Sequence, residues 1–208
     1  MSKVRDPLIQ PVEIAELRPT QITVGMREVT ERRKRWREMK KLERGRYLEQ
    51  HMIPVILGPK DRFYIVDHHH LARALYDEGV KRVFISTFED LGKLDQDTFW
   101  FTLDNRGWMH PFDTLGKRCS HEHIPRSVDK LKDDPYRSLA GELRRMGGYA
   151  KDTSPFSEFL WADFLRRRLD REQVQKNFRK ALRESYALAR SRDADYLPGW
   201  CGPVDNND

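Results

Sequence analysis

The segment spanning residues 53–85 limits the possible folds of this chain more than any other. It begins with the apolar run 53–57, and after a turn containing Gly and Pro a second apolar run ends at Val66. Apolar residues then recur at helical spacing as far as Gly79, and a third apolar run ends the segment. Short apolar runs between turn residues predict strands, and a glycine after a periodic stretch predicts a helix end. The segment therefore predicts a strand–strand–helix–strand unit of an α/β domain.

Four polar residues, Asp67 to His70, follow directly after the second predicted strand. We expect Asp67 to be the N-cap of a helix from His68 to about Glu78. The free N–H groups and the positive dipole end of a helix start bind anions, and protonated histidines there would add charge-assisted hydrogen bonds to a phosphate. Successive helical residues point about 100° apart, so the histidines cannot all face one ligand. The alternative is one buried, hydrogen-bonded histidine and one exposed histidine.

The two strands and the box Asp67–His70 resemble the ParB/sulfiredoxin superfamily, in which a strand leads into a box that binds nucleotide phosphates. The upstream segment Leu17–Gln21 resembles that superfamily's Pro-x-Gln/Glu element. Two further segments, Val24–Val29 and Asp133–Ala140, are similar to segments of the putative ParB-like nuclease family. This resemblance extends over about residues 10–190 and implies a ParB/sulfiredoxin-like domain with a small mixed sheet.

The box departs from the pattern of its relatives at several positions. His68 occupies a position where relatives have Gly, and Leu71 occupies one where a related box has Arg; Arg73 is the nearest basic residue. In the superfamily's free-serine kinases a Glu after the first strand is the catalytic base. The matching residue here is Gln21, which cannot accept a proton, and Glu28 is the nearest substitute.

The predicted fold class is α/β (α+β), with three regions. The ParB/sulfiredoxin-like domain covers 8–115, a helical C-terminal region packed on it covers 116–192, and a loose tail covers 193–208. In the helical region we expect one helix at 154–169, with Pro155 in its first turn, and another from Asp170 to about residue 190, begun by a capping box.

The basic charge is concentrated in one segment. Residues 27–46 contain ten Lys or Arg and four Glu, which equals the whole chain's net charge of +6. A helix is predicted over 28–49, and its basic face could bind nucleic-acid phosphates. Because Glu alternates with Arg, a solvated helix with i,i+4 ion pairs is the other interpretation. We find no helix-turn-helix pattern, so a partitioning role is not expected.

The remaining features bear on the compartment and on metals. Cys119 and Cys201 do not suggest a disulfide framework, and a reducing, cytoplasmic location is expected. The spacing of Cys119, His121 and His123 is unusual for zinc, so a zinc site is not favoured. No apolar run approaches the roughly 18 residues of a membrane span. The sequence does not predict an oligomeric state.

The leading functional hypothesis is a nucleotide-phosphate-binding protein that transfers or hydrolyses a phosphate of ATP, ADP, CTP or another small phosphorylated molecule, with Mg²⁺. Asp67, Glu28 and His69 are the candidate catalytic residues, and Asp67 is the candidate metal ligand. The candidate phosphate ligands are His68, His69, His70, Arg73, Gln21, Arg27, Arg137 and Lys151. For Arg137 the alternative is a helix start favoured by the preceding acidic residues. A ParB-like nuclease or DNA-binding protein and a non-catalytic ligand-binding module are the two alternative functions.

Overall fold

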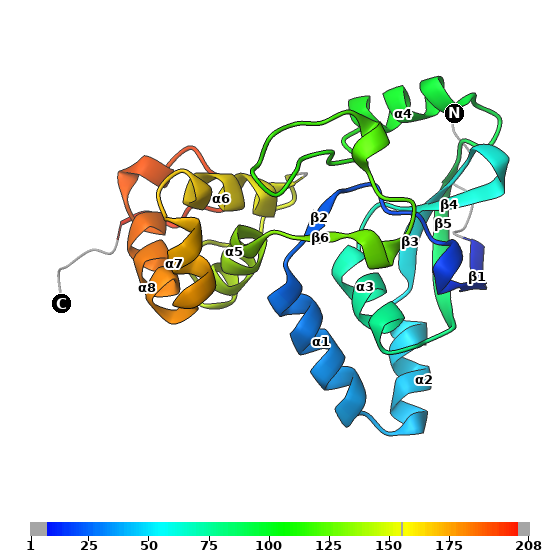
Figure 1. Cartoon of the computed structure of the whole chain (residues 1–208), viewed down its shortest axis with the longest axis horizontal. Coiled ribbons are helices and arrows are strands. Elements are labelled where there is room, and N and C mark those ends of the chain that lie inside the picture. Colours follow the sequence, from blue (N-terminus) through cyan, green and yellow to red (C-terminus); the bar gives the residue numbers. More distant parts are fainter. Residues whose placement is uncertain (1–7, 155, 204–208) are drawn as a thin grey trace. The chain divides into compact units, whose positions relative to one another are not determined.

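The structure is a computed structural model, and it describes residues 8–154 and 156–203 (Figure 1). The chain forms two compact units. The first consists of Met1–Val24 and Val29–Lys132, and the second of Gly25–Glu28 and Asp133–Asp208. The boundary between them falls after residue 132, whereas the sequence places it after residue 115. Pro155 and the end of the predicted tail, 204–208, lie outside the described residues.

A small mixed sheet forms the centre of the first unit. Its strands are β1 (Leu8–Glu13), β5 (Arg82–Asp90), β3 (Ile53–Gly58) and β4 (Arg62–Ile65), in the spatial order β1-β5-β3-β4. β3 runs parallel to β5 and antiparallel to β4, while β1 runs antiparallel to β5. The helix α3 (His69–Asp77) connects β4 to β5. The predicted strand–strand–helix–strand unit and the mixed α/β fold are therefore confirmed.

The basic segment forms two helices, so the prediction of one helix over 28–49 is wrong. They are α1 (Met26–Glu38) and α2 (Lys41–Gln50), and α1 begins in the second unit and continues into the first. Between them Lys40 has an extended backbone, and its N–H donates to the Glu43 carboxylate at 2.7 Å. This local capping replaces the helical hydrogen bonding that would have continued α1.

Several shorter elements complete the first unit. They are the two-residue strand β2 (Thr23–Val24), the helix α4 (Gln96–Asn105) and the 3₁₀ turns η1 (Ile14–Glu16), η2 (Pro59–Asp61), η3 (His121–His123) and η4 (Val128–Lys130). The short strand β6 (Lys132–Asp133) ends the unit, and the Lys132 N–H donates to the Ile22 carbonyl.

One aromatic cluster lies between β4 and α4. Tyr64 and Phe99 are almost fully buried, with ring centroids 4.6 Å apart. The backbone of Gly58 approaches both rings so closely that an added Cβ would lie 2.6 Å from the Tyr64 ring and 2.8 Å from the Phe99 ring. Glycine at this position therefore lets β3 pack against the aromatic cluster.

The second unit is helical, with α5 (Pro135–Arg145), α6 (Ser157–Arg166), α7 (Arg171–Lys176), α8 (Phe178–Ala189) and η5 (Arg192–Ala194). The Asp170 carboxylate accepts the Gln173 N–H at 2.9 Å, which agrees with the predicted cap. The single helix predicted after Asp170 is two helices, however. Asn177 leaves the helical conformation (φ −133°, ψ 64°), and its side chain caps α8 by accepting the Lys180 N–H.

Two segments that carry the family resemblance meet in the second unit. The Met26 N–H donates to the Asp133 carboxylate at 2.9 Å, and the Arg27 N–H donates to Ser138 Oγ at 3.3 Å. The backbone of Gly25 also packs closely against α5, since a Cβ added to Gly25 would lie 2.7 Å from the Ser138 nitrogen. The acidic residue before α5 therefore stabilises the first turn of α1.

The described part of the C-terminal segment is hydrogen-bonded to the helices of the second unit. The Ala150 N–H donates to the Gly199 carbonyl at 2.7 Å, and Trp161 Nε1 donates to the Pro198 carbonyl at 2.8 Å. Residues 198 and 199, which lie in the tail predicted to be loose, are thus hydrogen-bonded to the helical part of the second unit. Among the described helices, none has the length and apolar character needed to cross a membrane.

Candidate functional site

The histidine box starts α3 in a different way from the one the sequence predicts. His68 is the N-cap residue and has the left-handed conformation (φ 65°, ψ 24°), while Asp67 lies outside the helix. The Asp67 carboxylate accepts the adjacent His68 N–H at 2.6 Å, so the prediction of Asp67 as N-cap is wrong. Gly adopts the left-handed conformation without steric cost, whereas His68 does not.

The three histidines have different surroundings. His69 is 4% exposed, and its Nε2 accepts the backbone N–H of Thr20 at 3.1 Å. His68 Nδ1 lies 3.1 Å from the Met52 carbonyl, to which it donates when that nitrogen carries the proton. His70 is half-buried. One histidine is therefore buried and hydrogen-bonded, as in the alternative interpretation, but the exposed histidine of that interpretation is not found, since His68 and His70 are both half-buried.

Two more predicted phosphate ligands of the first unit are bonded within the protein. Gln21 is 6% exposed, and its amide donates to the Thr23 carbonyl at 2.7 Å. Arg73 Nε lies 3.0 Å from the Asp77 carboxylate, and Arg73 Nη1 donates to the Leu131 carbonyl at 2.9 Å. Arg73 thus connects α3 to the segment at Leu131, whereas the Gln21 bond is local.

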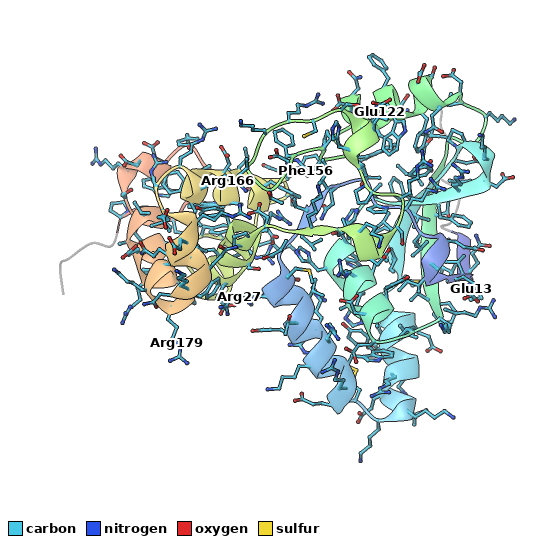
Figure 2. The ribbon with its side chains drawn as sticks, viewed as in Figure 1. Glu13, Arg27, Glu122, Phe156, Arg166 and Arg179 are labelled. Carbon is cyan, nitrogen blue, oxygen red and sulfur yellow. The ribbon has the colours of Figure 1, made fainter. Side chains whose placement is uncertain are left out.

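The other four predicted site residues belong to the second unit. The guanidinium of Arg27, labelled in Figure 2, lies over the Phe178 ring, 4.0 Å from its centroid. Arg137 is buried, 3.8 Å from a Glu158 oxygen, and burial lowers its pKa. Glu28 is half-buried and contributes to the electrostatic field at Arg137, whereas Lys151 is exposed. The predicted site residues are therefore divided between the two units.

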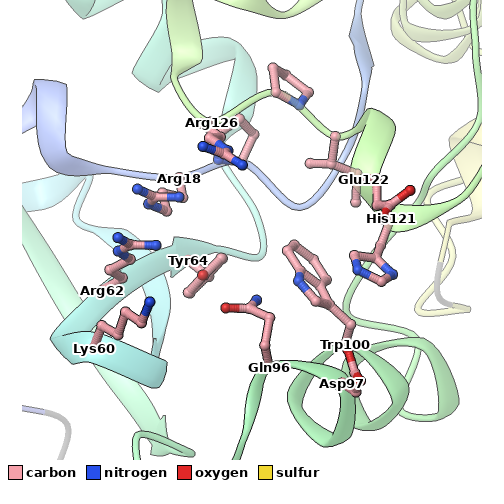
Figure 3. A pocket seen from close by; sticks show the side chains of 13 residues that line it. Arg18, Lys60, Arg62, Tyr64, Gln96, Asp97, Trp100, His121, Glu122 and Arg126 are labelled. Atoms are coloured by element: carbon pink, nitrogen blue, oxygen red, sulfur yellow. The ribbon is translucent and has the colours of Figure 1, made fainter.

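The first unit contains a basic pocket with a volume of about 520 Å³. Its lining residues come from segments that lie far apart in the sequence. Figure 3 shows the guanidinium groups of Arg18, Arg62 and Arg126 together with the Lys60 ammonium on one side of the pocket. Tyr64 lies in the middle. The opposite side is lined by Gln96, Asp97, Trp100, His121 and Glu122, and the remaining lining residues are Pro19, Ile124 and Pro125.

Strand β4 positions the cationic side of this pocket. The Arg18 N–H donates to the Phe63 carbonyl at 2.9 Å, and the Ile65 N–H donates to the Arg18 carbonyl at 2.8 Å, so Arg18 lies beside β4. Arg62 and Tyr64 are two residues apart on the strand and therefore point to the same face. Lys60, in the preceding turn, has φ 63°, a conformation that costs energy for a non-glycine residue.

The cationic side holds several positive charges close together. In the part of the chain that the structure describes, none of the four cations Arg18, Lys60, Arg62 and Arg126 forms an ion pair. Burial lowers the pKa of Arg18, and the nearby positive charges of Arg62 and Arg126 lower it further. Clustered like charges repel one another, so an anion in the pocket would be stabilised strongly.

The opposite side combines an aromatic pair with carboxylates. The Trp100 and His121 rings are stacked, with centroids 5.1 Å apart and an interplanar angle of 19°. Asp97 lies in the first turn of α4 and Glu122 lies in η3, and both side chains are exposed. A ligand with a phosphate at one end and a planar or hydrogen-bond-donating group at the other would match both sides.

The described residues contain no group of three or more His, Cys, Asp or Glu side chains close enough to hold a metal ion. Cys119 is half-buried, Cys201 is exposed, and both thiols are free. Mg²⁺ often binds proteins through one or two carboxylates together with substrate phosphates. Asp97 and Glu122, which line the side opposite the cations, are the carboxylates of the pocket that could take part in this mode.

Comparison with known proteins identifies the family. The sequence model of the family described as "Putative ParB-like nuclease" matches residues 10–167, which is more than half of the chain. The chain belongs to this family. The resemblance drawn from the box and its flanking segments is thereby confirmed, and the matched region of this ParB-like protein includes every residue that lines the pocket.

A solved structure is also similar. The crystal structure of protein Atu1540 from Agrobacterium tumefaciens has a TM-score of 0.89 and 51% sequence identity. The match covers 95% of this ParB-like protein and 99% of that chain. No curated protein matches the sequence.

Sequence reasoning missed the cations and aromatic residues of the pocket. Arg18 is the exception in part, because it lies inside the segment 17–21 that resembles the superfamily's upstream element. The other cations come from the β3–β4 turn, from β4 and from the loop after η3. No spacing connects these segments before the chain is folded.

Proposed function

We propose that this ParB-like protein binds a nucleotide, with its phosphates against Arg18, Lys60, Arg62 and Arg126, and transfers or hydrolyses a phosphate. The observation that supports the proposal is the convergence of these cations on one pocket without ion-pair partners among the described residues. Guanidinium groups suit phosphate oxygens because their N–H donors form paired, charge-assisted hydrogen bonds.

The charge of the pocket favours a free nucleotide over the interior of a nucleic-acid strand. A terminal phosphate carries about 1.5 to 2 negative charges near neutral pH. Each phosphodiester of nucleic acid carries roughly one, spaced along an extended backbone. Four cations around a cavity of about 520 Å³ therefore match a compact polyphosphate better than a row of diesters.

The opposite side of the pocket would hold the rest of the ligand. The His121 ring, supported by Trp100, offers a flat surface for a base, and base stacking on aromatic side chains is favourable. We assign Asp97 and Glu122 the role of binding Mg²⁺ carried by the phosphates, or of accepting a proton from the acceptor substrate. Catalytic roles for Asp67, Glu28 and His69 stay predictions.

Isothermal titration with ATP, ADP and CTP in the presence of Mg²⁺ tests the proposal. Arg18→Gln and Arg62→Gln should each weaken binding about tenfold or more, since each removes a charge-assisted contact. Arg82→Gln is the matched control, because Arg82 is 63% exposed on β5 and pairs with Glu13. Failure of all three nucleotides to bind the wild-type protein, or wild-type affinity in Arg18→Gln, would contradict the proposal.

A ParB-like nuclease or DNA-binding activity is the second candidate, supported by the family description and by the surface of α1 and α2. Arg33 and Arg37 are not available to bind DNA phosphates, because both donate hydrogen bonds to the Glu78 carboxylate at 2.7 Å. Exposed cations without such an ion pair among the described residues remain on these helices, namely Arg35, Lys41 and Arg46.

Gel-shift and plasmid-nicking assays with Mg²⁺ or Mn²⁺ test the second candidate. Reversing the charge of Arg35, Lys41 and Arg46 together should weaken DNA binding and flatten its salt dependence, since phosphate contacts release counterions. Unchanged DNA affinity in this triple variant would exclude the helical surface as the DNA-binding site. Nicking by wild-type protein that Arg18→Gln abolishes would instead place the nuclease reaction at the arginine pocket.

A further inference from the structure

A buried hydrogen bond connects the histidine box to the segment that carries Arg18. His69 and Thr20 are 49 residues apart, and the Thr20 N–H donates to His69 Nε2 at 3.1 Å. Both residues are almost fully buried. Because Nε2 accepts this proton, it has no proton of its own to donate to a phosphate while the bond is intact.

The segment 18–20 is held at both of its ends. Arg18 is bonded to β4 through its own N–H and carbonyl groups, and Thr20 Oγ1 donates to the Ile65 carbonyl at 2.7 Å. Pro19 lies between them and lines the pocket. Its ring fixes one backbone angle and removes an N–H donor, so the conformation of the segment depends on the bonds at its ends.

We propose that His69 is a positioning residue: by accepting the Thr20 N–H it fixes segment 18–20, and thereby places the Arg18 guanidinium in the pocket. The inference rests on the proposed function, since its effect on a ligand is read at that pocket. It also assigns the histidine box a task other than direct contact with phosphate. His69 acts on the anion through Arg18.

A direct contact between His69 and the phosphate makes a different prediction. Two residues that each contact the ligand contribute separately, so their losses of affinity add approximately. A positioning residue loses its effect once the residue that it positions has been removed. Substitution of His69 in an Arg18→Gln background therefore distinguishes the two possibilities.

Amide hydrogen exchange of the ligand-free, full-length protein tests the structural part. His69→Leu should speed exchange of the Thr20 amide by about tenfold or more, because the buried N–H loses its acceptor. His69→Gln should restore most of the protection, since its amide oxygen reaches about as far as Nε2. His69→Asn, which is polar but shorter, should not. His51→Leu is the control, because His51 follows the end of α2 and its ring stacks on Tyr47, with centroids 4.0 Å apart. Wild-type exchange of Thr20 in both His69→Leu and His69→Asn would overturn the proposal.

Titration with ADP and Mg²⁺ tests the effect on the pocket. His69→Leu should weaken ADP binding about tenfold, and His69→Gln should recover most of it. In the Arg18→Gln background His69→Leu should change affinity by less than about twofold. An equal loss in both backgrounds would overturn the proposal.

The two proposals fail in different ways. If ADP does not bind the wild-type protein, the proposed function fails, and the exchange of the Thr20 amide still decides whether His69 fixes the segment. If His69→Leu does not fold, the comparison of His69→Gln with His69→Asn gives the same decision, because the two variants differ in reach and share an amide.

Discussion

Glu78 holds α1 against the end of α3, and replacing it tests the electrostatics of the first unit. Its carboxylate accepts from Arg33 Nε at 2.7 Å and from both Nε and Nη2 of Arg37 at 2.7 Å. These hydrogen bonds lower the pKa of Glu78 from 4.5 to about 2, with the bond to Arg37 as the largest cause. Glu78→Gln keeps the shape of the side chain and removes the charge.

The size of the effect follows from this pKa. A shift from 4.5 to about 2 corresponds to roughly 3 kcal/mol of stabilisation if solvent screening is ignored. The Glu78 side chain is 10% exposed, but those of Arg33 and Arg37 are 31% and 61% exposed, so solvent screens the interaction. We therefore expect Glu78→Gln to lower the free energy of unfolding by about 1–2 kcal/mol at pH 7.

The pH dependence gives the sign of the effect. Because the pKa is lower in the folded protein, the stabilisation is fully present above pH 4.5 and is lost as the pH falls from there to about 2. Urea unfolding of the wild-type and Glu78→Gln proteins, each at pH 7 and pH 3, measures it. The difference between the two proteins should shrink to roughly half or less at pH 3. Equal stability at pH 7, or a difference that grows towards acid, would show that these ion pairs do not stabilise the folded protein.

Three further substitutions have expected effects on stability. His68→Val should destabilise the protein by about 1–2 kcal/mol relative to His68→Asn, because a β-branched residue fits the left-handed conformation poorly; urea unfolding of the pair measures this, and equal stability would contradict it. Gly58→Ala should cost at least about 2 kcal/mol, since the new methyl group meets the Tyr64 ring, and a melting temperature unchanged from wild type would exclude that steric account. Asp133→Ala should cost about 1 kcal/mol through loss of the bond to the Met26 N–H; thermal unfolding compared with Asp129→Ala tests it, and a larger effect in the control would speak against it.

The part of the fold that the sequence predicts well is the part that depends on local signals. The apolar runs and turn residues of segment 53–85 determine strands and a helix over short distances, and the structure contains them. The prediction failed where a short-range cap competed with a continuous helical pattern. Lys40 with Glu43 and Asn177 with Lys180 each begin a new helix inside a stretch predicted as one.

The candidate site was harder to predict, because its residues are far apart in the sequence and come together only in the folded protein. Arg18 lies beside β4 only through hydrogen bonds to Phe63 and Ile65, which are more than 40 residues away. The left-handed conformation of His68 likewise depends on the surrounding structure, since most non-glycine residues avoid it. Because the three histidines are adjacent in a predicted helix, the sequence indicated that they could not all face one ligand. It did not show that His69 would be bonded to Thr20.

Arginine side-chain NMR shows whether the cations of the first unit form one anion site, as we propose. The Nε–Hε signals of Arg18, Arg62 and Arg126 are followed while ADP and Mg²⁺ are added, with the signal of Arg82 as an internal control. We predict that the three pocket signals shift together and saturate at the same ADP concentration, while Arg82 stays unchanged. Pocket signals that do not move, or that move no more than the Arg82 signal, would show that these cations do not form an ADP site.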